Sequence, residues 1–176
     1  MIKVFKEKSL YFLIIAVSFF ACSTHRIAVL KTPVTNFGKY SVVEIPDFST
    51  SLGSSVSREA QRVIPDKIAA LVEKERLFTQ VRRHPTQLKE KVLLLHGVIT
   101  QFNPGSRLKR GISLGIGHIG AGFVTVKLTF VDKEMNQEIA QLDVEGQINW
   151  SPSGGSIYAC YDEISKEVLK FIRYYY

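Results

Sequence analysis

The stretch FVTVKLTFV at residues 123–131, followed after a polar turn by EIAQLDVEGQIN at residues 138–149, decides the fold class. In both segments apolar residues occupy every second position, and mostly polar residues stand between them. Successive side chains of a strand point to opposite faces, so each segment is predicted to be a strand with one buried and one wet face. The polar residues 132–137 predict a β-hairpin turn, in which Asn136 can supply the positive φ that turns often need.

Three further segments are predicted to be strands because they are rich in β-branched, aromatic or other apolar residues. They are residues 40–48, a short segment at 77–81, and the strongly apolar run 92–102. Residues 49–57 are rich in serine and glycine and are expected to form a loop.

Two amphipathic helices are predicted from apolar residues that recur at helical spacing. The first follows Ser57, and Pro65 is expected to start it or to kink an earlier turn, because proline is tolerated only in the first turn. The apolar stripes are Ile64, Ile68, Leu71 and Val72 in the first helix, and Ile157, Tyr161, Ile164, Val168 and Ile172 in the last one.

The expected fold class is therefore α+β, with a single domain at residues 39–176 and the order β-α-β-β-β-β-α. The sheet is expected to be mostly antiparallel or mixed, with the two helices packed on one face. A chain of 176 residues suits one such domain.

The N-terminus has the layout of a signal peptide at residues 1–21. Lys3, Lys6 and Lys8 form a basic region, and residues 10–21 are then uncharged and mostly apolar. This run is too short for a membrane helix, which needs about 20 apolar residues.

The segment Phe19-Phe20-Ala21-Cys22 resembles a lipobox, the processing site of bacterial lipoproteins, although leucine is more usual where Phe19 stands. The resemblance implies cleavage between Ala21 and Cys22, acylation of Cys22, and stable anchoring through several acyl chains. Ser23 rather than aspartate after the cysteine suits an outer-membrane lipoprotein that faces the periplasm. The alternative is an ordinary secretory signal with a cysteine near the cut.

Residues 22–38 include Pro33 and Gly38 and show no sustained periodicity, so they are interpreted as the lipidated cysteine and a tether. The second cysteine, Cys160, falls within the apolar pattern of the last helix. It is predicted to be a buried structural thiol rather than a reactive one.

The formal charge of the chain is +7, and without residues 1–21 it is +5. Such an excess favours anionic lipid or glycan surfaces, but it is also common on an ordinary solvated surface. No basic stripe with interleaved aromatic residues and no helix-turn-helix pattern occurs, so nucleic acid is not an expected partner.

An ordered set of features resembles the uncharacterised bacterial lipoproteins of domain-of-unknown-function family 4410. It runs from Asn103-Pro104-Gly105-Ser106 through Arg110-Gly111 and the glycines up to Gly122, then the two alternating strands, then Gly154-Gly155. The resemblance covers roughly residues 38–172. It implies a small α/β envelope domain and no assigned catalytic residue.

The glycine-rich segment also contains Gly115-Ile-Gly117-His-Ile-Gly120, which fits GxGxxG by its letters. A dinucleotide site needs that motif between a strand and a helix, whereas here a strand follows. Two interpretations stay open: a glycine-rich β connection, or a segment that contacts lipid or a neighbouring subunit. The residues of the second interpretation are Arg110, Ile112, Leu114 and Ile116.

No catalytic or metal-binding constellation is evident, so no catalytic residue, metal or cofactor is expected. The four histidines lack metal-ligand spacing. His96 lies in an apolar strand and is expected to be a hydrogen-bonded core residue, and Asp162-Glu163 are expected at a helix start, where acids favour the helix dipole.

The sequence favours a non-enzymatic accessory or assembly lipoprotein of the cell envelope, with an envelope protein or polymer as partner and with self-association left open. A module that binds a small ligand or glycan is the alternative, and an envelope hydrolase is a weaker one.

Overall fold

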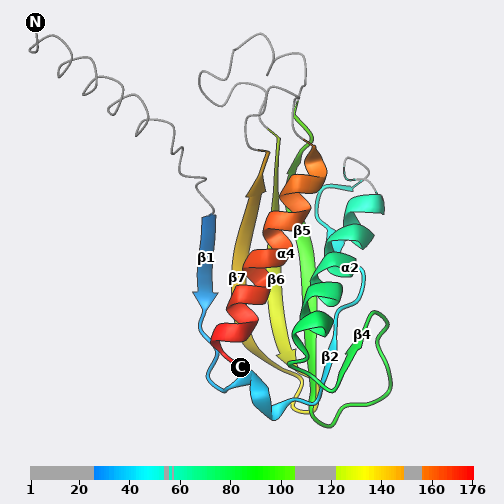
Figure 1. Ribbon diagram of the computed structural model, residues 1–176, viewed down its shortest axis with the longest axis vertical. Helices are drawn as coiled ribbons and strands as arrows, with labels where there is room; N and C mark the ends of the chain where they lie inside the picture. The colour runs from blue at the N-terminus through cyan, green and yellow to red at the C-terminus, as the bar shows by residue number, and fades with distance from the viewer. Residues whose placement is uncertain (1–25, 54–55, 57, 106–121, 149–155) are drawn as a thin grey trace, which may run out of the picture.

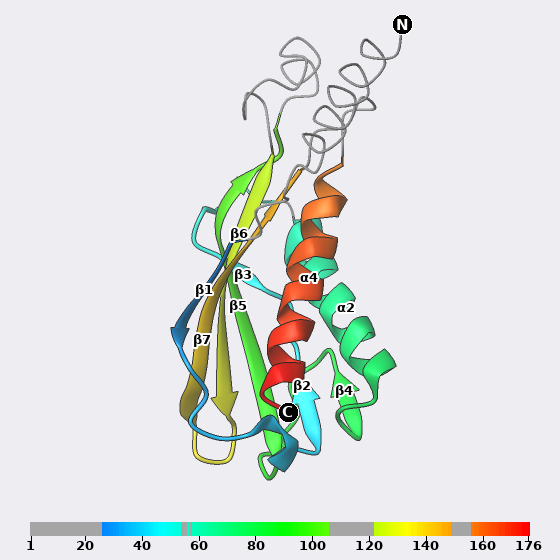
Figure 2. The same ribbon diagram turned by 60° about the vertical axis from the view of Figure 1, so that its left-hand side comes forward.

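The computed structural model describes residues 26–53, 56, 58–105, 122–148 and 156–176. Within them a seven-stranded sheet carries two long helices on one face, as Figures 1 and 2 show. The spatial order is β1-β7-β6-β5-β2-β4, and β3 pairs with β5. The elements are β1 (Arg26–Lys31), the 3-10 helix η1 (Phe37–Lys39), β2 (Val42–Glu44), β3 (Ser49–Thr50), α2 (Arg58–Glu75), β4 (Gln80–Arg82), β5 (Val92–Asn103), β6 (Phe123–Asp132), β7 (Gln137–Gln147) and α4 (Ile157–Tyr174).

The α+β class and the helices on one face are confirmed, and the sheet is mixed. β6 pairs antiparallel with both β5 and β7, while β2 pairs parallel with both β4 and β5. The expected hairpin is the β6–β7 unit, with Asn136 at φ 51° in its turn. The predicted strand at 40–48 is shorter than expected, because β2 ends at Glu44 and β3 falls in the expected loop.

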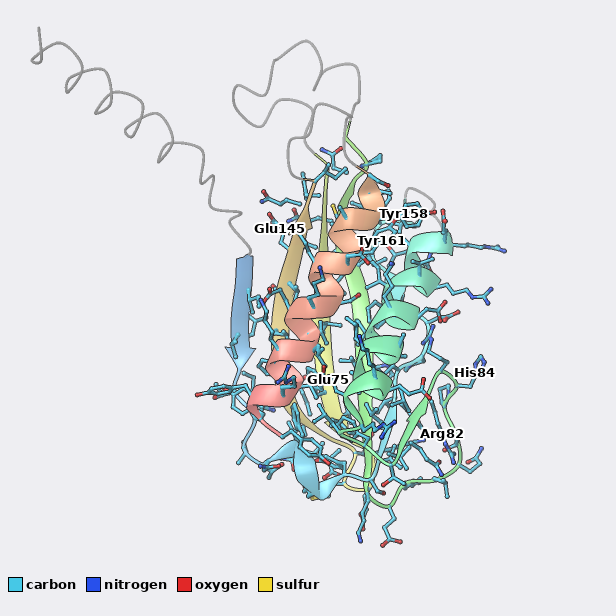
Figure 3. The ribbon with its side chains drawn as sticks, viewed as in Figure 1. Glu75, Arg82, His84, Glu145, Tyr158 and Tyr161 are labelled. Carbon is cyan, nitrogen blue, oxygen red and sulfur yellow. The ribbon has the colours of Figure 1, made fainter. Side chains whose placement is uncertain are left out.

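The two helices pack on the sheet, and charged or polar side chains on their flanks join them to each other. Lys67 of α2 lies 2.6 Å from Asp162 of α4. Near the start of α4, labelled in Figure 3, Tyr158 donates a hydrogen bond to Glu59. Burial raises the pKa of the neighbouring Tyr161 to about 12, so its hydroxyl stays neutral.

Pro65 stands inside α2 and not at its start, which corrects the expectation from sequence. A proline lacks the N–H that would bond the carbonyl four residues earlier, here that of Gln61. That carbonyl instead accepts a hydrogen bond of 2.8 Å from the Phe48 amide. The proline therefore frees an acceptor that fixes the chain between β2 and β3 against the helix.

Cys160 is fully buried in α4, as predicted, and its backbone packs tightly against Gly146 of β7. Its sulfur lies 4.0 Å from the Gly122 carbonyl oxygen. A side chain at Gly146 of β7 would collide with the Cys160 backbone, so this crossing requires glycine.

The tether expected at residues 22–38 is corrected by the structure. Residues 26–31 form β1, which pairs antiparallel with β7, and Phe37 of η1 is fully buried in the core. The folded domain therefore includes residues well before position 39.

His96 is exposed on the face of the sheet without helices, so its expected place in the core is wrong. β5 alternates, and Leu95 and Gly97 point to the helices instead. At Gly97 the Phe48 ring fills the space of a side chain, since an added Cβ would lie 2.5 Å from that ring.

Candidate interaction surface

One sheet edge is apolar and exposed. In β1 the run Ile27–Leu30 is exposed throughout, with Ile27 at 37%, Val29 at 45% and Leu30 at 51%. An edge strand offers unpaired backbone groups, and proteins usually protect it with charges, proline, bulges or a covering element. We call residues 27–30 the β1 edge, and its composition makes it a candidate contact surface.

The β1 edge extends the core layer beyond the cover of α4. Ile27 stands opposite Val144 and Val29 opposite Leu142, and both β7 partners are fully buried. Figure 1 shows α4 over β7 and β6, with β1 lying beyond the helix. Ile27 and Val29 thus share the core-facing side of the sheet without a helix above them.

The end of β1 is fixed to the fold. The Lys31 ammonium donates to the backbone carbonyl of Glu138 and lies 3.6 Å from its carboxylate. Further on, the Phe37 ring stacks on Phe130 with centroids 5.1 Å apart, and the Phe37 amide donates to the Tyr175 carbonyl at 2.7 Å. The strand is therefore held in place although its apolar side chains face solvent.

The opposite edge is closed. β4 is only three residues long, and the following Arg83 lies 2.6 Å from both Asp47 and Asp66. Short strands and charges are common means of protecting an edge. We call residues 80–83 the β4 edge.

A buried ion pair holds the loop behind β4. Glu44 is fully buried and lies 2.6 Å from the Lys133 ammonium, and it accepts hydrogen bonds from the Thr86 amide and hydroxyl. Burial alone would raise the pKa of Glu44, but these donors together hold it below its ordinary value. The carboxylate is thus ionised at neutral pH and serves to hold the loop.

Asp132 forms a second buried carboxylate site beside the first. Its oxygens accept from Lys39 at 2.9 Å, from the Tyr40 hydroxyl at 2.9 Å, and from the amides of Glu134 and Met135 at 3.1 Å. Burial opposes ionisation, but these donors prevail and lower the pKa of Asp132. The site ties η1 to the β6–β7 turn.

On either side of the sheet, one charged group forms its hydrogen bonds with a neutral amide side chain. Glu145 of β7 accepts from Gln147, and Arg82 of β4 donates to Gln80 at 2.6 and 3.0 Å. Figure 3 shows Glu145 on the β7 side of the molecule, with Arg82 and His84 on the β4 side. An acidic group on the β7 side and a basic group on the β4 side are thus not paired with each other.

The site residues predicted from sequence, Ala21, Cys22, Arg110, Ile112, Leu114 and Ile116, lie outside the described residues. The positions where their segments join the fold are described. Phe123 pairs with Asn103 and Gln147, and Arg26 pairs with Glu145. Both segments therefore join the same end of the sheet.

The sequence analysis missed the β1 edge and both buried carboxylate sites. The signal for β1 was the run IAVL at residues 27–30, which is apolar enough for a strand but does not alternate. Glu44 had a weaker signal, as an acid inside a predicted strand.

Among the described residues, no group of three or more histidine, cysteine, aspartate or glutamate side chains could hold a metal ion. None of the helices in the described part of the chain is long and apolar enough to span a membrane.

A family model described as Domain of unknown function (DUF4410) matches residues 40–150, which confirms the resemblance found in the sequence. No curated protein matches the chain.

Solved structures share the fold at low sequence identity. A PelC dodecamer from Paraburkholderia phytofirmans aligns at a TM-score of 0.59 and 11% identity, over 85% of this chain and 97% of that one. The hypothetical protein CT253 from Chlamydia trachomatis aligns at 0.54 and 9%, over 77% and 97%. Protein XCC0632 from Xanthomonas campestris aligns at 0.53 and 8%, over 85% and 91%. At these identities the likeness concerns the fold alone.

Proposed function

We propose that this chain, which belongs to the DUF4410 family, is a non-enzymatic assembly subunit of a bacterial cell envelope. Lipid on Cys22 holds it at a membrane, and the β1 edge joins it to further copies of itself. The observation that carries the proposal is the β1 edge, where four apolar residues in a row stay exposed on a firmly anchored strand.

A second copy of this chain is the partner that we propose for the β1 edge. PelC, whose fold is similar over 85% of this chain, is a dodecamer. This fold is therefore compatible with assembly into a large homo-oligomer.

The contact between copies is proposed to join two different surfaces. Two β1 strands paired antiparallel and in register would place the basic end residues Arg26 and Lys31 opposite each other. A contact between the β1 side of one copy and the β4 side of the next avoids this repulsion and can bring Glu145 near Arg82. Such head-to-tail contacts produce rings when the rotation closes.

The non-enzymatic role is supported by the two buried carboxylates. Among the described residues, Glu44 and Asp132 are the buried acids with the most donors, and those donors are side chains and amides that hold loops. Their lowered pKa values suit permanent anions rather than groups that exchange protons near neutral pH.

Sedimentation of residues 23–176 tests the proposed assembly, because this chain keeps β1 and lacks Cys22. Leu30→Lys places a charge at the β1 edge. Met135→Lys is its control, since Met135 is 56% exposed against 51% for Leu30 and lies in the β6–β7 turn, away from both edges. We expect an oligomer that Leu30→Lys dissociates and Met135→Lys leaves intact. A monomer for the unaltered chain at high concentration, or equal effects of the two variants, would contradict the proposal.

The anchor and its location are proposed from the lipobox-like segment and Ser23. Mass spectrometry of the protein extracted from membranes should show a chain that starts at Cys22 and carries acyl groups. Membrane fractionation should place it in the outer membrane, and Cys22→Ser should release it. A chain found in membranes without acyl groups would refute this part of the proposal.

A further inference from the structure

We infer that the end of the sheet where β1 begins faces the lipid bilayer, and that the β6–β7 turn points away from it. This inference rests on the proposed lipid at Cys22 and adds an orientation to it. We call the end of the sheet where β1 begins the near end, and the end with the β6–β7 turn the far end.

The connection from the anchor to the fold is short. Four peptide units separate Cys22 from Arg26, and such a stretch spans at most about 14 Å whatever its path. β1 is in turn fixed to the domain, because it pairs with β7 and its end is held by Lys31 and Phe37. An acylated Cys22 would therefore keep the near end within reach of the membrane surface.

The direction of β1 assigns the two ends. Arg26 stands opposite Glu145 and Lys31 opposite Gln141, so the strand runs from the near end toward the β6–β7 turn. The ten residues of β6 extend about 33 Å in that direction, more than twice the reach of the connection. The far end, with the exposed Met135, would then lie clear of the bilayer.

The charge of the chain suits a lipid surface. Without residues 1–21 the formal charge is +5. A basic excess is attracted to anionic lipid, so the partner is a bilayer that contains anionic lipid.

This orientation leaves the β1 edge available to neighbours. With the strands running away from the membrane, the β1 edge and the β4 edge face sideways, parallel to the membrane plane. Copies could then pack side by side while all their anchors enter the same leaflet.

Fluorescence quenching on the full lipidated chain tests the orientation. Gln101 at the near end and Met135 at the far end are both exposed, and each is replaced by cysteine and labelled. Cys160 is fully buried and Cys22 carries lipid, so the label reaches the new site. The vesicles contain phosphatidylcholine, phosphatidylglycerol and a lipid with a spin-labelled headgroup, and Cys22→Ser forms of both labelled proteins are the controls.

We expect several-fold stronger quenching at position 101 than at position 135. Quenching at both positions should be much weaker in the Cys22→Ser controls, because only the charge of the chain then attracts it to the vesicles. Insertion of about 20 glycine and serine residues after Ser23 should bring the two values together, because a flexible linker of that length no longer restricts the domain.

Equal quenching at the two positions, or stronger quenching at 135, would overturn the orientation while leaving the anchor intact. A difference that survives the insertion would overturn the role of the short connection. If mass spectrometry finds no acyl group on the purified chain, the proposed anchor and the orientation both fail.

Discussion

The two edges of the sheet are built in opposite ways. The β4 edge is three residues long and is flanked by Arg83, which pairs with two aspartates, and by a loop held on the buried Glu44. The β1 edge is six residues long and exposes four consecutive apolar residues. β1 has an irregularity between Val29 and Lys31 and a charged residue at its end, but its apolar side chains stay exposed all the same. This difference supports the proposal that the β1 edge makes a contact.

The largest effect is expected from Phe37→Ala, which removes the anchor at the end of β1. Phe37 is fully buried and stacks on Phe130, so its loss should cost about 3–5 kcal/mol of unfolding free energy. Urea denaturation measures this, and sedimentation should show weaker assembly below the transition. Val34→Ala is the control, because Val34 is 82% exposed and should change stability by less than about 0.5 kcal/mol. A similar small change for both variants would mean that β1 needs no anchor.

Glu44→Gln should weaken the β4 side of the fold. It leaves the largely buried Lys133 without its counter-charge, which should cost about 3 kcal/mol of unfolding free energy. Thermal unfolding measures the loss. An unchanged unfolding free energy would show that the ion pair does not hold the loop.

Acid should remove the stabilisation by the ionised Glu44 from the unaltered chain. The pKa of Glu44 is lower in the folded protein than its ordinary value of about 4.3, so its stabilisation is present above that value. It is lost as the pH falls through the folded pKa. Unfolding free energies measured from pH 7 down to pH 2 should therefore converge for Glu44→Gln and the unaltered chain. A constant gap between them would contradict the assignment.

The smallest effect is expected from the charges on the two sides. Arg82→Glu and Glu145→Arg should each weaken assembly by about 0.2–1 kcal/mol, which is up to about fivefold in the dissociation constant. The double variant should recover most of the affinity. If the losses of the two single variants instead add up in the double variant, these two groups do not meet between copies.

Most of the fold could be predicted from local patterns. The alternation in β6 and β7 and the stripe from Tyr161 to Ile172 in α4 are strong periodic signals, and the structure confirms them. The positive φ of Asn136 in the turn could also be predicted, because asparagine tolerates that conformation.

The errors share a physical cause, because they concern residues whose place is set by distant partners. The partners of β1 on β7 lie more than 100 residues along the chain, and IAVL has no alternation to reveal a strand. His96 stands in the run VLLLHGV, which does not alternate, and Gly97 beside it faces the core, where the Phe48 ring fills the space of a side chain. Pro65 is tolerated inside α2 because the Phe48 amide uses the acceptor that it leaves free.

Photocrosslinking in cells tests the proposed role of the β1 edge most directly. A photoreactive amino acid replaces either Val29 on the β1 edge or Met135 in the β6–β7 turn, in the full chain with its own signal segment. We expect a crosslinked dimer of the protein from position 29 and little or none from position 135. The absence of a dimer at position 29, or equal dimers at both positions, would contradict the claim that the β1 edge joins copies of this chain.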